Sequence, residues 1–333
     1  MLKNPNGITG FIDKSLSVAY NAVWDTVDYA KLLIDAASHN TYLETVKSEY
    51  LPDADTIHYH IESEEVNVAK LHETFHRVTD NNLKKLKNQW CILIFDYTYE
   101  AFYGYSVNAW INDYKPVRGS TGCFKFFSAS LVVGNRKYFI ESLPVNKLTN
   151  EIELMERVFK KLKELRIKVS VVLIDRGLAN DSKVLRLLES KCLRYLGLYP
   201  KYDNVKEILL ETNRTMFRIP FEVKGVKTNL VVIKTDEHDW TFVTNLDLRK
   251  VWRYVRVYKK RWNIETGFRV CDEARIKTKS LDIRVRYFLF LIAVLLYNLW
   301  YLLDRPTSFK RLVIRFWEYV EDKVDRIRGC KVP

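Results

Sequence analysis

The chain has 333 residues, 47% hydrophobic and 14% aromatic, enough to bury the core of two or three domains or of one large domain. Its formal charge of +13 indicates a polyanionic partner, either nucleic acid or an anionic membrane surface, and its composition argues against disorder. Five scattered cysteines without C-x-x-C spacing argue against a disulfide framework, and the first residues lack a signal-peptide core, so we expect a cytoplasmic protein.

The first segment, residues 1–87, is predicted to be a helical DNA-binding domain. Apolar residues at helical spacing predict helices over 26–46 and 68–89, with a short helix through 57–61 between them. A helix, a turn and a short helix suit a helix-turn-helix reader of DNA. An all-helical packing domain fits the same pattern, so both interpretations stay open.

A different pattern begins after this segment and predicts the first part of an α/β core over residues 88–212. The segments 90–99 and 168–175 each contain an apolar run that ends in an acid, which predicts two buried strands. Between them, two further apolar runs flank a Gly-Asn turn and predict a hairpin. Helices are predicted over 150–166 and 181–197 because their apolar residues form one stripe.

Strands return over residues 213–248 and predict a β-rich insertion. One long basic helix is then predicted over 249–274, in the second part of the core, which runs to residue 305. Between Arg249 and Lys279 eleven Lys or Arg stand against three acids, a surplus of eight positive charges. A lone carboxylate in this stretch, Glu265, is either a salt-bridge partner or a metal ligand that works on a polyanion.

The segment 287–303 carries no charge over 17 positions, near the lower limit of the roughly 20 residues that span a membrane. It contains Asn298 and is the only such run, so a buried core helix is favoured over a membrane span. A charged helix over 306–333 closes the chain.

Three carboxylates occupy positions typical of a metal site. Asp96 is predicted to end the first strand, Asp175 ends a later strand, and Glu265 lies on the late helix. Open α/β sheets place their chemistry at strand ends, where such acids can meet around two divalent cations. Each acid also has a structural explanation: a turn residue at Asp96, a partner of Arg176 at Asp175, and an i−4 partner of Arg261 at Glu265.

The stretch "YKKRWNIETGF" places Tyr258, Arg261 and Glu265 at the spacing Y-x-x-R-x-x-x-E. With "LIFDYTY" around Asp96 and "VVLIDRG" around Asp175, it resembles DDE transposases of the large insertion-sequence group that has a β-rich insertion before the catalytic glutamate. The resemblance covers about residues 88–303 of this chain.

This resemblance implies a ribonuclease H-like fold: a mixed sheet flanked by helices, with the N-terminal helical domain and the β-rich insertion added. It implies that Asp96, Asp175 and Glu265 bind two Mg²⁺ ions, for which Mn²⁺ can substitute. The implied function is a transposase that binds terminal inverted repeats, cleaves DNA strands and transfers them to target DNA. We expect a homodimer in the DNA complex and no membrane association.

The resemblance also implies that Tyr258 and Arg261 contact DNA phosphates. The other basic residues that we expect at the DNA are Lys259, Lys260, Arg269 and Lys277. The chain departs from the family at Asp272, an acid where the family has a lysine. Two further interpretations therefore remain: a structure-specific nuclease of the same fold, and a decayed transposase that binds DNA without cutting it.

Two other features have weaker functional interpretations. "HETFH" at residues 72–76 fits the H-E-x-x-H pattern of zinc peptidases, with Glu73 as general base and Glu100 at a tolerable distance for a third ligand. This pattern leaves the basic helix unexplained. Trp240 could stack on an unpaired base, although a strand aromatic that fills a small core is the favoured interpretation.

Overall fold

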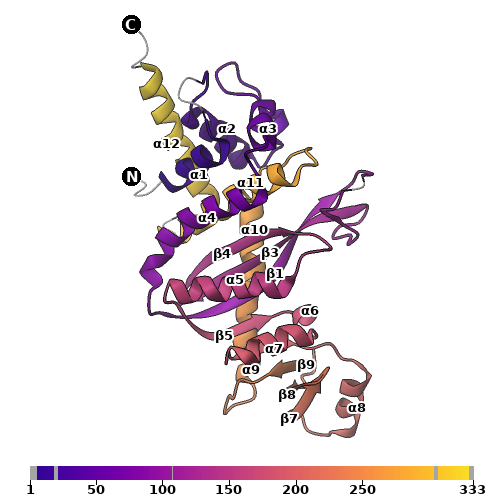
Figure 1. The fold of residues 1–333 in the computed structure, drawn as a ribbon. Helices are drawn as coiled ribbons and strands as arrows, with labels where there is room; N and C mark the ends of the chain where they lie inside the picture. The colour runs from indigo at the N-terminus through magenta and orange to yellow at the C-terminus, as the bar shows by residue number, and fades with distance from the viewer. Residues whose placement is uncertain (1–5, 19–21, 107, 304–306, 330–333) are drawn as a thin grey trace.

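The computed structural model describes residues 6–18, 22–106, 108–303 and 307–329 (Figure 1). One mixed sheet of nine strands organises the chain, in the order β2-β3-β1-β5-β6-β9-β8-β7, and β4 also pairs with β3. The strands are β1 (Trp90–Phe102), β2 (Ile111–Asn112), β3 (Gly122–Val133), β4 (Arg136–Val145), β5 (Lys168–Ile174), β6 (Tyr195–Leu198), β7 (Met216–Val223), β8 (Val226–Ile233) and β9 (Trp240–Thr244).

The centre of the sheet has the predicted ribonuclease H-like arrangement. Strands β4, β3 and β1 are antiparallel neighbours, whereas β1, β5 and β6 run parallel. The segment expected as a β-rich insertion supplies β7, β8 and β9, and β9 pairs antiparallel with β6. These three strands therefore continue the same sheet instead of forming a separate one.

Twelve α-helices among the described residues surround the sheet. They are α1 (Asn6–Leu16), α2 (Thr26–His39), α3 (Ala54–Glu62), α4 (Val68–Leu83), α5 (Glu151–Glu164), α6 (Arg176–Ala179), α7 (Ser182–Ser190), α8 (Asp203–Glu211), α9 (Arg253–Tyr258), α10 (Trp262–Asp272), α11 (Ile283–Leu302) and α12 (Phe309–Gly329). Helices α1 to α3 gather with α12 at one end of the molecule and β7 to β9 lie at the other (Figure 1).

Alternating side chains of β3 identify the two faces of the sheet. Phe126 stacks on Phe290 of α11, with ring centroids 4.5 Å apart. Its neighbour Phe127 points the other way and stacks on Phe95, which meets Phe159 of α5 at 5.8 Å. Successive side chains of a strand face opposite sides, so α11 and α5 cover opposite faces.

Helix α11 is long and apolar enough to cross a membrane, but 89% of its most apolar window is buried inside the protein. It lies against β4, α4 and α10, as a core helix does. Its one polar side chain in the middle, Asn298, is also buried. The amide oxygen accepts from the Phe139 nitrogen, and the amide nitrogen donates to the Phe139 oxygen, both at 2.8 Å.

Replacing Asn298 with leucine is expected to destabilise the protein by about 3 kcal/mol. The change leaves a buried N–H and a buried C=O of β4 without partners, and each such group costs roughly 1–3 kcal/mol. Urea unfolding of the variant measures the loss. Asn180→Ala, which removes an exposed hydrogen bond to Tyr202, is the control and should change stability by no more than about 0.5 kcal/mol. Equal stabilities of the two variants would contradict the anchoring role.

Four predicted helices have clearly different bounds in the structure. The helix expected over 68–89 ends at Leu83 and is followed by a 3₁₀ turn at Lys84–Leu86. The helix expected over 26–46 ends at His39, because Asn40 adopts the left-handed conformation and caps it. The helix expected over 181–197 ends at Ser190, since the apolar residues 195–198 form β6 between β5 and β9. The single basic helix is divided into α9 and α10 by a 3₁₀ turn at Lys259–Arg261.

Candidate active site

Asp96 lies on β1 just beyond the point where the parallel pairing with β5 ends. The parallel pairing of β1 with β5 ends at Ile94 and Leu173, two residues before Asp96. The expectation that Asp96 ends the strand was wrong, because β1 continues to Phe102 through its antiparallel pairing with β3. The carboxylate accepts a hydrogen bond from the Tyr97 nitrogen at 2.8 Å, and the residue is buried.

Asp175 follows directly on β5, the parallel neighbour of β1. Its carboxylate caps the short helix α6 by accepting from the Leu178 nitrogen at 2.9 Å. Because the last parallel pair, Ile94 with Leu173, lies two residues before Asp96 in β1 and two residues before Asp175 in β5, the two aspartates leave the same edge of the sheet. The strand order therefore brings together the two aspartates that the sequence placed at strand ends.

Glu265 reaches the same place from α10, and Arg261 connects it to Asp96. The Arg261 guanidinium donates to Asp96 Oδ2 at 2.6 Å and also forms an ion pair with Glu265. The i−4 partnership of Glu265 with Arg261 is thus present in the structure. The two acids on either side of the guanidinium differ in exposure, since the Glu265 side chain is 49% exposed and that of Asp96 is 13% exposed.

Negative charge accumulates around Asp96. Burial raises its pKa to about 6, Arg261 opposes the rise, and the charges of Asp175 and Glu265 add to it. Three carboxylates this close repel each other unless a cation lies among them. Mg²⁺ prefers oxygen ligands, so the chemical type of these carboxylate donors suits a divalent cation. In this structure the guanidinium of Arg261 holds two of the carboxylates.

Gly267 lets α10 approach the sheet closely. A Cβ atom at this position would lie 3.1 Å from the Phe139 ring and 3.2 Å from the Tyr297 hydroxyl oxygen. Glycine costs about 1 kcal/mol relative to alanine inside a helix. The close approach to β4 and α11 explains why this helix has one, two residues after Glu265.

Tyr258 and Trp240 belong to one aromatic cluster. The Tyr258 ring is 2% exposed and packs 5.1 Å from the ring of Phe242, and burial raises its pKa to about 12. Trp240 stacks on Phe242 at 5.8 Å and meets Tyr258 edge-on at 6.4 Å. Trp240 therefore packs in a small aromatic core, which was the favoured interpretation. Its stacking on a DNA base stays a prediction.

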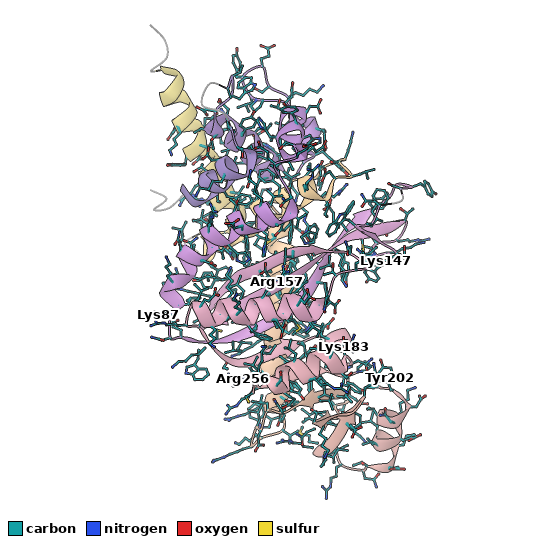
Figure 2. The ribbon with its side chains drawn as sticks, in the orientation of Figure 1. Lys87, Lys147, Arg157, Lys183, Tyr202 and Arg256 are labelled. Atoms are coloured by element: carbon teal, nitrogen blue, oxygen red, sulfur yellow. The ribbon has the colours of Figure 1, made fainter. Side chains whose placement is uncertain are left out.

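The other basic residues expected at DNA lie on the surface, three of them on or next to α10 and Lys277 beside Thr41 and Leu43 of the N-terminal segment. Lys259, Lys260, Arg269 and Lys277 are all exposed. Arg256 also points outward from α9 (Figure 2). At the position of the family lysine, Asp272 forms an ion pair with Arg275 at 2.9 Å, which neutralises the unexpected acid.

A second group of metal-ligand side chains lies away from these carboxylates. Among the described residues, one group has potential metal-ligand atoms that all lie within 4.8 Å of one another: His72, His76 and Glu141. The sequence interpretation of HETFH missed Glu141 and considered Glu100, which pairs instead with Arg286. An acid inside the apolar strand sequence "YFIESLPV" was the signal that could have pointed to it.

The chain belongs to the DDE transposase family, as its sequence shows. The family described as "Transposase DDE domain" matches residues 83–299. No curated protein sequence matches the chain.

Solved structures of transposases are similar in fold. One is the cryo-EM structure of a piggyBac transposase synaptic complex with hairpin DNA, at 13% identity and a TM-score of 0.62. The similarity covers 100% of this chain and 80% of that one. A Drosophila P element transposase strand transfer complex matches at 11% identity and a TM-score of 0.24, over 55% of this chain and 40% of that one, too low to inform the fold.

Proposed function

We propose that the protein binds the terminal inverted repeats of its own element, cleaves DNA strands there and transfers the 3′ ends to target DNA. The observation that carries this proposal is the convergence of Asp96, Asp175 and Glu265 from β1, β5 and α10. On the Y-x-x-R-x-x-x-E spacing we place it in the insertion-sequence group with that signature. The family supports metal-dependent chemistry on DNA in general, and the specific reaction is our inference.

The three carboxylates would hold the divalent ions, two Mg²⁺ or Mn²⁺. When bound, such ions activate a water or a 3′-hydroxyl and stabilise the leaving oxygen of a phosphodiester. Asp96 and Asp175 are fixed by backbone hydrogen bonds at one sheet edge, which holds their oxygens in place. The Glu265 side chain is more exposed, so we expect it to be accessible to DNA bound at the surface of α10.

The basic surface around α10 would hold the DNA backbone. Lys259, Lys260, Arg269 and Lys277 are exposed and free to contact phosphates, which provide affinity without sequence preference. Because its ring is buried, Tyr258 can contact the DNA backbone only through the edge of the ring. We assign base reading to the helices of residues 1–87, and two copies would hold the two ends together.

The test uses DNA from both sides of the gene as substrate. Purified protein is incubated with and without Mg²⁺, and the 3′ ends are mapped at nucleotide resolution. Metal-dependent cuts at the edge of an inverted repeat are expected. They should disappear in Glu265→Gln and persist in Glu273→Gln, which changes an exposed acid at the end of the same helix.

The other outcomes distinguish the alternative functions. Binding of the repeats without any cut would indicate a decayed transposase, and Asp272→Lys would then be the next variant. Cuts in branched DNA that ignore the repeat sequence would indicate a structure-specific nuclease of the same fold.

A further inference from the structure

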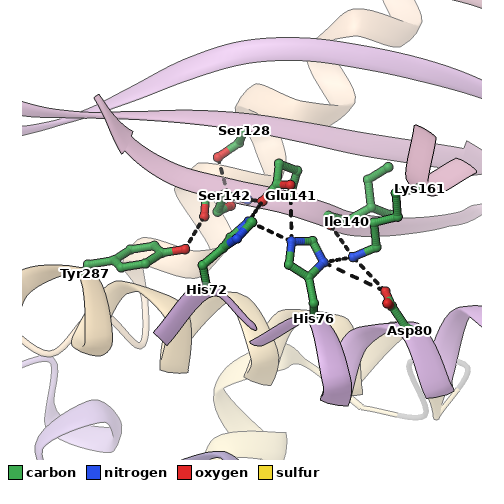
Figure 3. A network of polar contacts seen from close by, with 9 residues as sticks. All are labelled: His72, His76, Asp80, Ser128, Ile140, Glu141, Ser142, Lys161 and Tyr287. Atoms are coloured by element: carbon green, nitrogen blue, oxygen red, sulfur yellow. Dashed lines mark hydrogen bonds and ion pairs between the residues drawn. The ribbon is translucent and has the colours of Figure 1, made fainter. Parts of the chain in front are cut away.

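A buried polar cluster joins helix α4 to strand β4 (Figure 3). His72 and His76 are four residues apart and so project from the same face of α4. His72 Nε2 lies 2.6 Å from Glu141 Oε1, and His76 Nε2 lies 3.2 Å from Glu141 Oε2. The two Nε2 atoms are themselves 2.6 Å apart, so the two imidazoles and the carboxylate face one another in a triangle of three groups.

While Glu141 is ionised, protons on the imidazoles cannot give every group in this triangle a favourable hydrogen bond. A hydrogen bond from each imidazole to Glu141 needs a proton on both Nε2 atoms, and those two N–H groups would then face each other at 2.6 Å. If one Nε2 atom is unprotonated instead, its lone pair faces a carboxylate oxygen. With Glu141 ionised, every arrangement of imidazole protons therefore leaves one repulsive contact, whereas a cation among these groups attracts all of them.

We propose that His72, His76 and Glu141 bind a divalent transition-metal ion, with zinc as the ion that best suits the site. Two imidazole nitrogens and one carboxylate oxygen form a ligand set that proteins use for zinc. The Glu141 side chain is 2% exposed, and a buried carboxylate needs a positive charge beside it. This site is separate from the carboxylates at α10 and does not depend on the proposed function.

Surrounding groups can orient these ligands. The Ser142 nitrogen donates to Glu141 Oε1 at 3.0 Å and holds the carboxylate. A His76 bound through Nε2 carries its proton on Nδ1, which faces Asp80 Oδ1 at 3.9 Å. Lys161 contacts the same nitrogen in this structure, and its ammonium group also lies 2.6 Å from Asp80 Oδ1 and 3.2 Å from the Ile140 oxygen.

The role of this site is structural. In a zinc peptidase, the glutamate of H-E-x-x-H acts as general base at the metal. Here Glu73 is 64% exposed and pairs with Arg77 at 2.5 Å, on the outside of α4. The ion would therefore fasten α4, at the end of the N-terminal helical segment, to the sheet that carries Asp96.

The test is a titration of the full-length protein, freed of metal, with Co²⁺ as a spectroscopic probe and Zn²⁺ as competitor. One equivalent of Co²⁺ should produce the visible absorption of a four-coordinate site, Zn²⁺ should remove it, and Zn²⁺ should raise Tm. His76→Asn and Glu141→Gln should weaken binding by at least about 100-fold. Glu73→Gln lies in the same motif and should bind as the wild type does.

Two results would overturn the proposal. The first is a folded wild-type protein that shows no Co²⁺ absorption and no change of Tm with Zn²⁺, which would leave a cluster held by protons. The second is an equal loss of binding in Glu73→Gln. If the His76 and Glu141 variants do not fold, the wild-type titration and the Glu73 variant still decide the question.

Discussion

Asp175→Asn is expected to abolish DNA cleavage while DNA binding is retained. Asparagine caps a helix about as well as aspartate, so the bond to the Leu178 nitrogen that begins α6 remains and the fold is preserved. What is lost is one negative charge where the three acids converge. Metal-assisted stabilisation of a phosphoryl transition state is worth several kcal/mol, so the cleavage rate should fall on the order of 10³-fold.

The chain contains a matched control for this variant. Asp181 caps α7 in the same way, by accepting from the Lys183 nitrogen at 2.8 Å, but lies outside the site. Asp181→Asn should cleave at the wild-type rate. Single-turnover cleavage and a gel-shift assay, carried out on both variants, separate the chemical step from binding. Wild-type cleavage by Asp175→Asn would remove this residue from the catalytic triad.

Arg261→Met is expected to make the stability of the protein depend on Mg²⁺. The guanidinium now neutralises Asp96 and Glu265, and removing one partner of a buried ion pair costs roughly 3–5 kcal/mol. In Mg²⁺-free buffer the variant should therefore have a clearly lower Tm than the wild type. Added Mg²⁺ should restore much of that loss by taking the place of the missing charge, and should change the wild type much less.

Arg256→Met is the control, because this arginine is exposed on α9 and lies away from the three acids. It should have nearly the wild-type Tm with and without Mg²⁺. Differential scanning calorimetry over a Mg²⁺ series measures all three proteins. The same Mg²⁺ response in the wild type and in Arg261→Met would show that the guanidinium and the metal do not share a position.

Most strands and the longer helices could be predicted because their apolar patterns are local, whereas β6 was expected as the end of a helix. What could not be predicted is the pairing of β9 with β6, which joins residues about 45 positions apart and makes the expected insertion part of the central sheet. Pairing partners are chosen by the packing of the whole sheet, and a strand pattern does not specify them. The break at Lys259–Arg261 was likewise invisible, since a 3₁₀ turn keeps nearly helical dihedral angles.

For the site, strand order was sufficient to bring Asp96 and Asp175 together, because parallel neighbours end at one edge. The role of Arg261 was not predicted. Its spacing from Glu265 indicated an ordinary surface pair, and only the tertiary packing of α10 on β1 adds Asp96 to it. Glu141 was missed for a similar reason: its partners lie about 70 residues earlier, on a helix whose distance from β4 no local pattern gives.

Helix α11 completes the core late in the chain, and this order has a consequence during synthesis. Chains emerge from the ribosome N-terminus first, and their domains fold as they appear. When residues up to about 250 have emerged, Asp96 and Asp175 are present, but Glu265 and the apolar helix that covers β3 and β4 are not. An unfinished chain thus lacks one of the three acids that we propose as catalytic, so a truncated product would expose an uncovered sheet and would not act as an unregulated nuclease.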